Sequence, residues 1–290
     1  MSKYFKLNLA KSDFLPELMM IHDKVILSFE ELVSYGDQIF AESKISLDRK
    51  IQDYVLPKED GFVDLSKIQN DWFPSINNYQ VFISHSHNDE DLAKALASYL
   101  YCKYSISSFI DSLIWGNVFE LQKIIDDEYC SEKDENGNIT SYSYEKRNFT
   151  TSHLHLMLNT ALMQSMQVAQ LFFFINTEDS INFKNIKGEW TYSPWIYSEL
   201  SMSKSMYELE KNSKTKPLFE CVGCYSEIPL FQKVQMTHLT SITKKDIDAC
   251  CAEKKGSQAL EALKNFPPQT NKNQINEFYG KRNDNKKNIF

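Results

Sequence analysis

Short apolar segments alternate with helix-patterned segments through the middle of the chain. The apolar segments are typical of buried strands and cover residues 81–84, 106–110, 171–176, 217–221 and 238–242. Helices are predicted after the first of these strands, over residues 154–170, and from Ser193-Pro194, where serine suits the cap and proline the first turn. Alternation of this kind predicts an α/β fold, in which helices cover both faces of a parallel sheet.

The first 78 residues have a different pattern. Apolar residues recur near helical spacing, and residues 14–56 therefore predict helices. We expect residues 1–78 to form an N-terminal helical extension that packs on the next domain or on a second copy of the chain. The α/β domain is predicted over residues 79–245, and residues 246–290 are expected to form a C-terminal helix followed by a polar tail.

A long segment separates the second and third predicted strands. Residues 118–129 have a helical pattern, and Asn136-Gly137 is a strong turn signal. We interpret residues 116–151 as an insertion that stands over the C-terminal edge of the sheet.

Composition narrows the classes of function. The chain has 290 residues, 42% hydrophobic and 24% charged, as ordinary globular proteins have. Its formal net charge of −7 argues against nucleic acid as a partner, because phosphate contact favours a basic surface. We find neither a secretory pattern nor an apolar stretch near the roughly 20 residues that span a bilayer. We therefore expect a cytoplasmic protein without a membrane partner.

The cysteine and histidine spacings predict no metal site. Cys221 and Cys224 have the spacing of half a zinc site, but no second ligand pair with a suitable spacing accompanies them. His85 and His87 lie two residues apart and would need further ligands. A strand end with small residues explains the Cys221–Cys224 segment more simply.

Two segments carry candidate chemistry. Ser84, His85 and Ser86 lie at the end of the first α/β strand, where such sheets bind ligands. The alternative is that these side chains only form hydrogen bonds within the turn between strand and helix. Trp195 and Glu199 lie four residues apart and so share one face of a helix. A carboxylate on such an apolar face is costly unless it has a partner or a task, and burial would raise its pKa. A solvated glutamate beside a core tryptophan is the alternative.

These segments together resemble a known family. VFISHSHNDEDLAKAL, the strand SSFID, the helix that carries Ala161 and Ser165, and SPWIYSEL occur in the order found in TIR (Toll/interleukin-1 receptor) domains. The resemblance covers about residues 79–245, interrupted by the insertion. The N-terminal extension resembles that of bacterial stand-alone TIR proteins, which are often found in antiphage defence.

The resemblance implies a flavodoxin-like fold and an enzyme that cleaves the nicotinamide–ribose bond of NAD⁺. NAD⁺ would be the substrate, and no further cofactor is expected. Glu199 aligns with the family's catalytic glutamate. The implied substrate-binding residues are Ser84, His85, Ser86, Asp111, Trp115 and Trp195. A fixed carboxylate suits this chemistry, because cleavage builds an oxocarbenium-like cation at the ribose.

Several alternatives stay open. The product could be ADP-ribose, a cyclic isomer or a conjugate, sensed by a downstream effector protein. Family members also self-associate through TIR domains, so a non-catalytic interaction scaffold is a second hypothesis. A nucleoside deoxyribosyltransferase-like enzyme, which shares the layout and a glutamate nucleophile, is the third.

Overall fold

A five-stranded parallel sheet organises the chain in the computed structural model. The structure describes residues 3–14, 19–21, 24–26, 28–51, 54, 56, 58–59, 62–181, 189–211 and 232–267. The sheet strands are β1 (Lys3–Leu7), β6 (Val81–Ser84), β7 (Ser108–Phe109), β10 (Leu171–Ile175) and β13 (Thr240–Ile242), in the order β13-β1-β10-β6-β7. Every neighbouring pair is parallel. The predicted α/β fold is confirmed, as are four of the predicted strands in position, while residues 217–221 lie outside the described residues.

Helices and two-stranded ribbons connect the sheet strands. The helical elements are η1 (Lys11–Phe14), α1 (Phe29–Ile51), α2 (Leu65–Trp72), η2 (His87–Asp89), α3 (Glu90–Tyr104), α4 (Asp111–Ile114), α5 (Val118–Ile125), η3 (Asp126–Cys130), α6 (Tyr144–Val168), α7 (Pro194–Lys211), α8 (Lys244–Cys251) and α9 (Ser257–Lys264). The antiparallel ribbons are β2 (Met19–Ile21) with β3 (Lys24–Ile26), β4 (Lys58–Glu59) with β5 (Phe62–Val63), β8 (Ser131–Lys133) with β9 (Ile139–Tyr142), and β11 (Trp190–Thr191) with β12 (Gln232–Lys233).

The N-terminal strand corrects the prediction of a separate helical extension. β1 lies inside the sheet and pairs with β10 from Lys3 opposite Leu171 to Leu7 opposite Ile175. The β2–β3 ribbon also falls within the stretch 14–56 that was predicted to be helical, and α1 accounts for the rest of that signal. A five-residue strand with buried residues on both faces has too short a pattern to be distinguished from a helix by periodicity alone.

The strand order is that of a doubly wound, flavodoxin-like sheet with one substitution. The flavodoxin-like order is 2-1-3-4-5, where the numbers follow the chain. If β6 is strand 1, then β7 is strand 2, β10 is strand 3 and β13 is strand 5. The fourth position, between β10 and β13, is occupied by β1. The beginning of the chain therefore completes the sheet on which the rest of the domain is built.

Aromatic rings connect four of the five sheet strands. Tyr4 contacts Phe172, Phe172 stacks on Phe82, and Phe82 stacks on Phe109, with ring centroids 6.3, 5.9 and 5.3 Å apart. Each such pair contributes about 0.5–1.5 kcal/mol beyond the area that it buries. Because the four rings come from β1, β10, β6 and β7, this row ties the N-terminal strand to the three strands that follow it.

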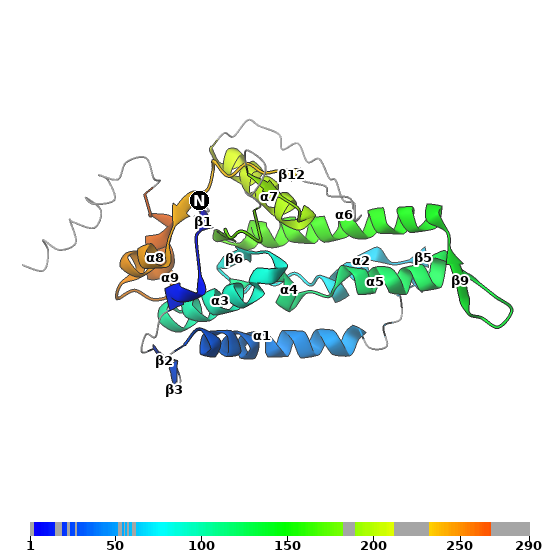
Figure 1. The fold of residues 1–290 in the computed structure, drawn as a ribbon, viewed down its shortest axis with the longest axis horizontal. Coiled ribbons are helices and arrows are strands. Elements are labelled where there is room, and N and C mark those ends of the chain that lie inside the picture. The colour runs from blue at the N-terminus through cyan, green and yellow to red at the C-terminus, as the bar shows by residue number, and fades with distance from the viewer. Residues whose placement is uncertain are drawn as a thin grey trace, which may run out of the picture.

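Helices cover both faces of the sheet (Figure 1). α6 and α7 lie on one side of β6, and α3, with α1 outside it, lies on the other. Gly36 of α1 lies so close to α3 that an added Cβ would be 2.9 Å from the Cβ of Lys94. Lys94 also forms ion pairs with Asp37 of α1 and Glu90 of α3, both at 2.9 Å.

The insertion extends well beyond the sheet (Figure 1). α6 has 25 residues and is ~37 Å long at 1.5 Å per residue, whereas a five-residue strand spans only ~16 Å. The first half of α6 therefore projects past the sheet, together with α2, α5 and the β8–β9 ribbon. The predicted helix and the Asn136-Gly137 turn of the insertion are confirmed.

The C-terminal helices α8 and α9 pack on the α/β domain. Asp248 of α8 accepts a hydrogen bond from Tyr104 of α3 at 2.6 Å, and Lys3 of β1 donates to the carbonyl oxygen of Phe266 at 2.8 Å. The predicted polar tail lies outside the described residues. No helix in the described part of the chain is both long and apolar enough to cross a membrane.

The position of β1 predicts that the N-terminal strand is indispensable for stability. Phe5 is fully buried against Phe173, with ring centroids 5.4 Å apart, so Phe5→Ala should lower the free energy of unfolding by about 3–5 kcal/mol. Tyr101→Ala, at an exposed site on α3, should change it by less than about 0.5 kcal/mol. Urea unfolding followed by circular dichroism measures both. Equal, small effects would mean that β1 is not part of the core.

Candidate functional site

The candidate site lies where the sheet reverses its winding direction. The chain passes from β6 through α3 to β7 on one side of β6, whereas β10 lies on the other side. Doubly wound sheets bind ligands in the crevice outside the carboxyl ends of the strands at such a point. Ser84 ends β6, and Asp111 begins α4 directly after β7. Both predicted residues therefore lie at the expected edge of the sheet.

Helix α7 brings Glu199 to the end of β6. The hydroxyl of Ser84 donates a hydrogen bond of 2.5 Å to Oε2 of Glu199, and the two side chains are 1% and 3% exposed. The start of α7 is as predicted, with Pro194 in its first turn and the Ser193 hydroxyl accepting from the backbone N–H of Ile196 at 3.2 Å. This start places Glu199 in the second turn of the helix.

Burial dominates the electrostatics of Glu199. Removal from water raises the pKa of its carboxyl well above 4.5, and the negative charge of Asp111 raises it further. The hydrogen bond from Ser84 opposes these effects, because it favours the ionised form. Within the described residues neither carboxylate has an ion pair with lysine or arginine. A ligand that brings positive charge would therefore be favoured here, and it would lower the pKa of Glu199.

Helix α6 fixes the start of α7 beside the site. The half-exposed Trp195 packs on the ring of His155, with centroids 5.4 Å apart. One turn further along both helices, the Ser198 hydroxyl donates to the side chain of Asn159 at 2.6 Å. Burial lowers the pKa of His155, so this imidazole is mainly neutral at pH 7. Trp195 thus stands one turn before Glu199 on the same helix, as predicted.

Two residues of the turn after β6 differ in their contacts: Ser86 is bonded within the fold, whereas His85 is only partly engaged. The Ser86 hydroxyl donates to Asp89, and the Thr177 hydroxyl, just after β10, donates to the same carboxylate oxygen. This clamp ties together the turns that follow two neighbouring strands. Ser86, a predicted substrate-binding residue, is thereby committed to the clamp. Asp89 is at the N-cap position of α3, but its side chain makes no capping bond to that helix.

His85, the residue before Ser86, is partly exposed and has only one side-chain contact of this kind in the part of the chain that the structure describes. Its Nε2 lies 3.3 Å from the hydroxyl of Ser112 on α4, and its Nδ1 is buried without a partner among the described residues. Nearby Glu90 experiences opposing effects on its carboxyl. Burial pushes the pKa of Glu90 upwards, but Lys94, Ser112 and His85 together hold it below its usual range. His85 therefore lies in the turn after β6, as predicted, and it contacts α4, which follows β7.

Trp115 is a core residue, which corrects its predicted role in the site. Its side chain is 6% exposed and packs edge-on against Phe73 and Phe109. The indole N–H donates to the carbonyl oxygen of Pro74 at 3.2 Å. The ring is buried between these aromatic neighbours and its donor is engaged, so Trp115 is not available to stack on a substrate base.

Sequence reasoning missed several residues that position the site. Thr177 and Asp89 clamp the turns, Asn159 holds α7, and Ser112 contacts His85. Thr177 had a usable signal, because it follows the third predicted strand as Ser86 follows the first. The partners Asn159 and Ser198 lie 39 positions apart, and no local pattern relates them.

Comparison with protein-family models, with curated proteins and with solved structures gives no match for this chain.

The raised pKa of Glu199 predicts a pH-dependent gain in stability when the carboxyl is replaced. Because the pKa is higher in the folded than in the unfolded protein, the wild type loses stability as pH rises from about 4.5 towards the folded value. Glu199→Gln keeps the shape but cannot ionise, so its stability advantage should grow by up to about 1.4 kcal/mol per pH unit in that window.

Denaturant unfolding between pH 4 and 9 measures this difference. Glu208→Gln, at an exposed position on the same helix, is the matched control and should show a flat difference. A flat difference for Glu199→Gln as well would show that this carboxyl ionises as easily as one in water.

Proposed function

We propose that this chain is a TIR-like enzyme that cleaves the bond between nicotinamide and ribose in NAD⁺. One observation carries the proposal: a buried glutamate, hydrogen-bonded to the serine that ends β6, lies at the switch point of a flavodoxin-like sheet. Ser84 and Glu199 are 115 positions apart in sequence. Two of the four segments that carry the sequence resemblance therefore meet at this hydrogen bond.

The charge balance of the reaction matches the charge of this site. As the C1′–N bond breaks, its electron pair leaves with nicotinamide, which becomes neutral, and positive charge develops on the ribose. Water or another nucleophile then bonds to C1′ and releases a proton. A fixed carboxylate next to C1′ stabilises this charge throughout, and in a site removed from water the effect is large. Glu199 is assigned this role.

The raised pKa of Glu199 gives the site a preference for cationic substrates. In the free protein, burial and Asp111 favour the neutral carboxyl. The nicotinamide ring of NAD⁺ carries a positive charge, so its binding favours the ionised form of Glu199 and is linked to loss of a proton. Asp111 adds to the attraction for the same cation. A neutral leaving base would lack this contribution.

The remaining site residues have supporting roles in the proposal. Trp195 forms the wall one turn before Glu199, and His85 and the backbone of its turn bind the ribose or phosphates. On the basis of the sequence resemblance, the product is ADP-ribose, a cyclic isomer or a conjugate that a separate effector senses in antiphage defence. The protruding half of α6 is then available for self-association.

Removal of the carboxylate should abolish the activity. Glu199→Ala and Glu199→Gln should reduce nicotinamide release from NAD⁺ by about 100-fold or more, because the developing charge loses its stabilising anion. The purified full chain is assayed with and without lysate of phage-infected cells, and mass spectrometry identifies the nucleotide product. Glu208→Ala is the matched control and should retain full activity. Release that is unchanged in the Glu199 variants would rule out this assignment.

The two neighbours of Glu199 should move the pH profile in opposite directions. Asp111→Asn removes a negative neighbour, so the pKa of Glu199 falls and the acidic limb of kcat/KM moves to lower pH. Ser84→Ala removes the donor that favours the ionised form, so the limb moves to higher pH. Profiles between pH 4 and 9 test both shifts. Shifts in the same direction, or none, would exclude Glu199 as the group whose ionisation controls the rate.

A further inference from the structure

A cavity of about 740 Å³ lies between α5, η3, the first half of α6 and the β5–α2 segment. Its volume is in the range of small-molecule binding sites. Leu65, Ile125 and Leu154 supply aliphatic walls, and Tyr129 and Phe149 supply aromatic ones. The described residues that line this cavity do not include the serine and carboxylates of the candidate site, so it is a separate place on the molecule.

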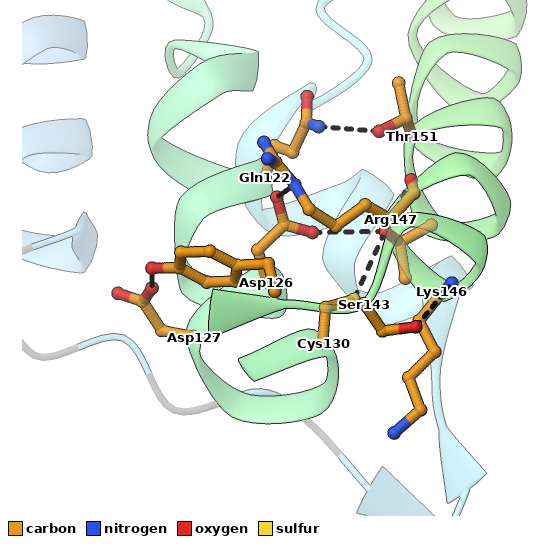
Figure 2. A network of polar contacts seen from close by, with 10 residues as sticks. Gln122, Asp126, Asp127, Cys130, Ser143, Lys146, Arg147 and Thr151 are labelled. Carbon is orange, nitrogen blue, oxygen red and sulfur yellow. Dashed lines mark hydrogen bonds and ion pairs between the residues drawn. The ribbon is translucent and has the colours of Figure 1, made fainter. Parts of the chain in front are cut away.

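A polar network beside the cavity ties α6 to α5 and to the η3 turn (Figure 2). Asp126, which is 3% exposed, accepts from Arg147 Nε at 2.9 Å and from the Thr150 hydroxyl at 3.2 Å. Gln122 of α5 donates to the Thr151 hydroxyl of α6 at 2.6 Å. The charge-assisted bond between Asp126 and Arg147 and the bond between Gln122 and Thr151 fix α6 relative to η3 and α5, the elements that line the cavity.

The cavity wall includes a rare backbone conformation. Residues Asp126–Cys130 form a π-helical turn directly after α5. Such turns occur frequently at functional sites, since they are less favourable than continued α-helix. This turn places Tyr129 and Cys130 in the cavity wall, and its end is fixed by the backbone N–H of Ser143, which donates to the Cys130 carbonyl oxygen at 2.8 Å.

The rim of the cavity indicates what kind of molecule would fit. Phe149 is 66% exposed although it also lines the cavity, so a large apolar surface faces water at the rim. Its ring is packed against His153, with centroids 4.2 Å apart, and the His153 Nδ1 lies 2.9 Å from the Phe149 carbonyl oxygen. Glu145 and Lys146 carry opposite charges at the same rim. The rim therefore favours neither an anionic nor a cationic ligand, but its apolar surface favours contact with an apolar one.

We propose that this cavity binds an uncharged, apolar small molecule. The site is independent of the proposed catalytic centre, but both contact the same helix. Leu154 lines the cavity, and the next residue, His155, packs on Trp195 of α7. A bound molecule would cover the exposed ring of Phe149 and fill a space whose walls are already fixed.

The neutral fluorophore N-phenyl-1-naphthylamine tests the proposal with the full chain and without NAD⁺. Its emission should rise and saturate at one molecule per chain. Phe149→Ala should weaken binding at least ~5-fold, because the aromatic wall is lost. Leu156→Ala removes another exposed apolar side chain of α6, one that does not line the cavity, and should leave binding within ~2-fold. Equal losses in both variants would reduce the effect to non-specific adsorption and overturn the proposal.

A cavity-filling variant gives a second, independent readout. Leu65→Trp places a larger ring at the half-exposed start of α2 and should abolish binding, while thermal unfolding confirms that the variant is folded. Unchanged binding in a folded Leu65→Trp variant would contradict the assignment. Glu199→Ala should bind the fluorophore as the wild type does. The fluorophore result would therefore stand even if the protein did not cleave NAD⁺. In the same way, a failure to bind the fluorophore would not affect the proposed NAD⁺ cleavage.

Discussion

The hydrogen bond from Ser84 to Glu199 is the interaction on which the functional reading of this fold depends. It joins the end of a central strand to the second turn of a helix that begins more than a hundred residues later. A buried carboxyl with a serine donor, a second carboxylate nearby and no lysine or arginine paired to it among the described residues is costly. Such a site is explained if a ligand supplies the missing positive charge. In the proposed reaction, the cationic nicotinamide and then the developing ribose cation would supply that charge.

Helix α6 gives the molecule its second organising constraint. Its C-terminal half packs with α7 and leads into β10, whereas its N-terminal half forms the wall of the cavity in the insertion (Figure 1). The helix is longer than the sheet requires, and the excess length carries the insertion away from the sheet edge. A single rigid element therefore contacts the candidate site through His155 and Asn159 and the cavity through Phe149 and Leu154.

Much of the α/β domain could be predicted because the relevant signals are local. The apolar run at 171–175 is buried throughout, as a central parallel strand must be. Ser193 caps α7 and Pro194 lies in its first turn, as the sequence predicts. This start puts Glu199 in the second turn of the helix. The candidate site was partly predictable for the same reason. Ser84 and Asp111 follow strands, and the carboxyl ends of parallel strands meet at one edge of a sheet.

The amino-acid sequence by itself determined the type of each strongly patterned element and which residues end it, because periodicity and caps act over a few neighbouring positions. Only the tertiary structure decided that β1 lies between β10 and β13, that Ser86 is engaged by Asp89, and that Trp115 is enclosed by Phe73 and Phe109. Each of these outcomes depends on which surfaces meet across long separations in sequence. Packing and the need to satisfy buried polar groups select among such pairings, and neither acts through adjacent residues alone.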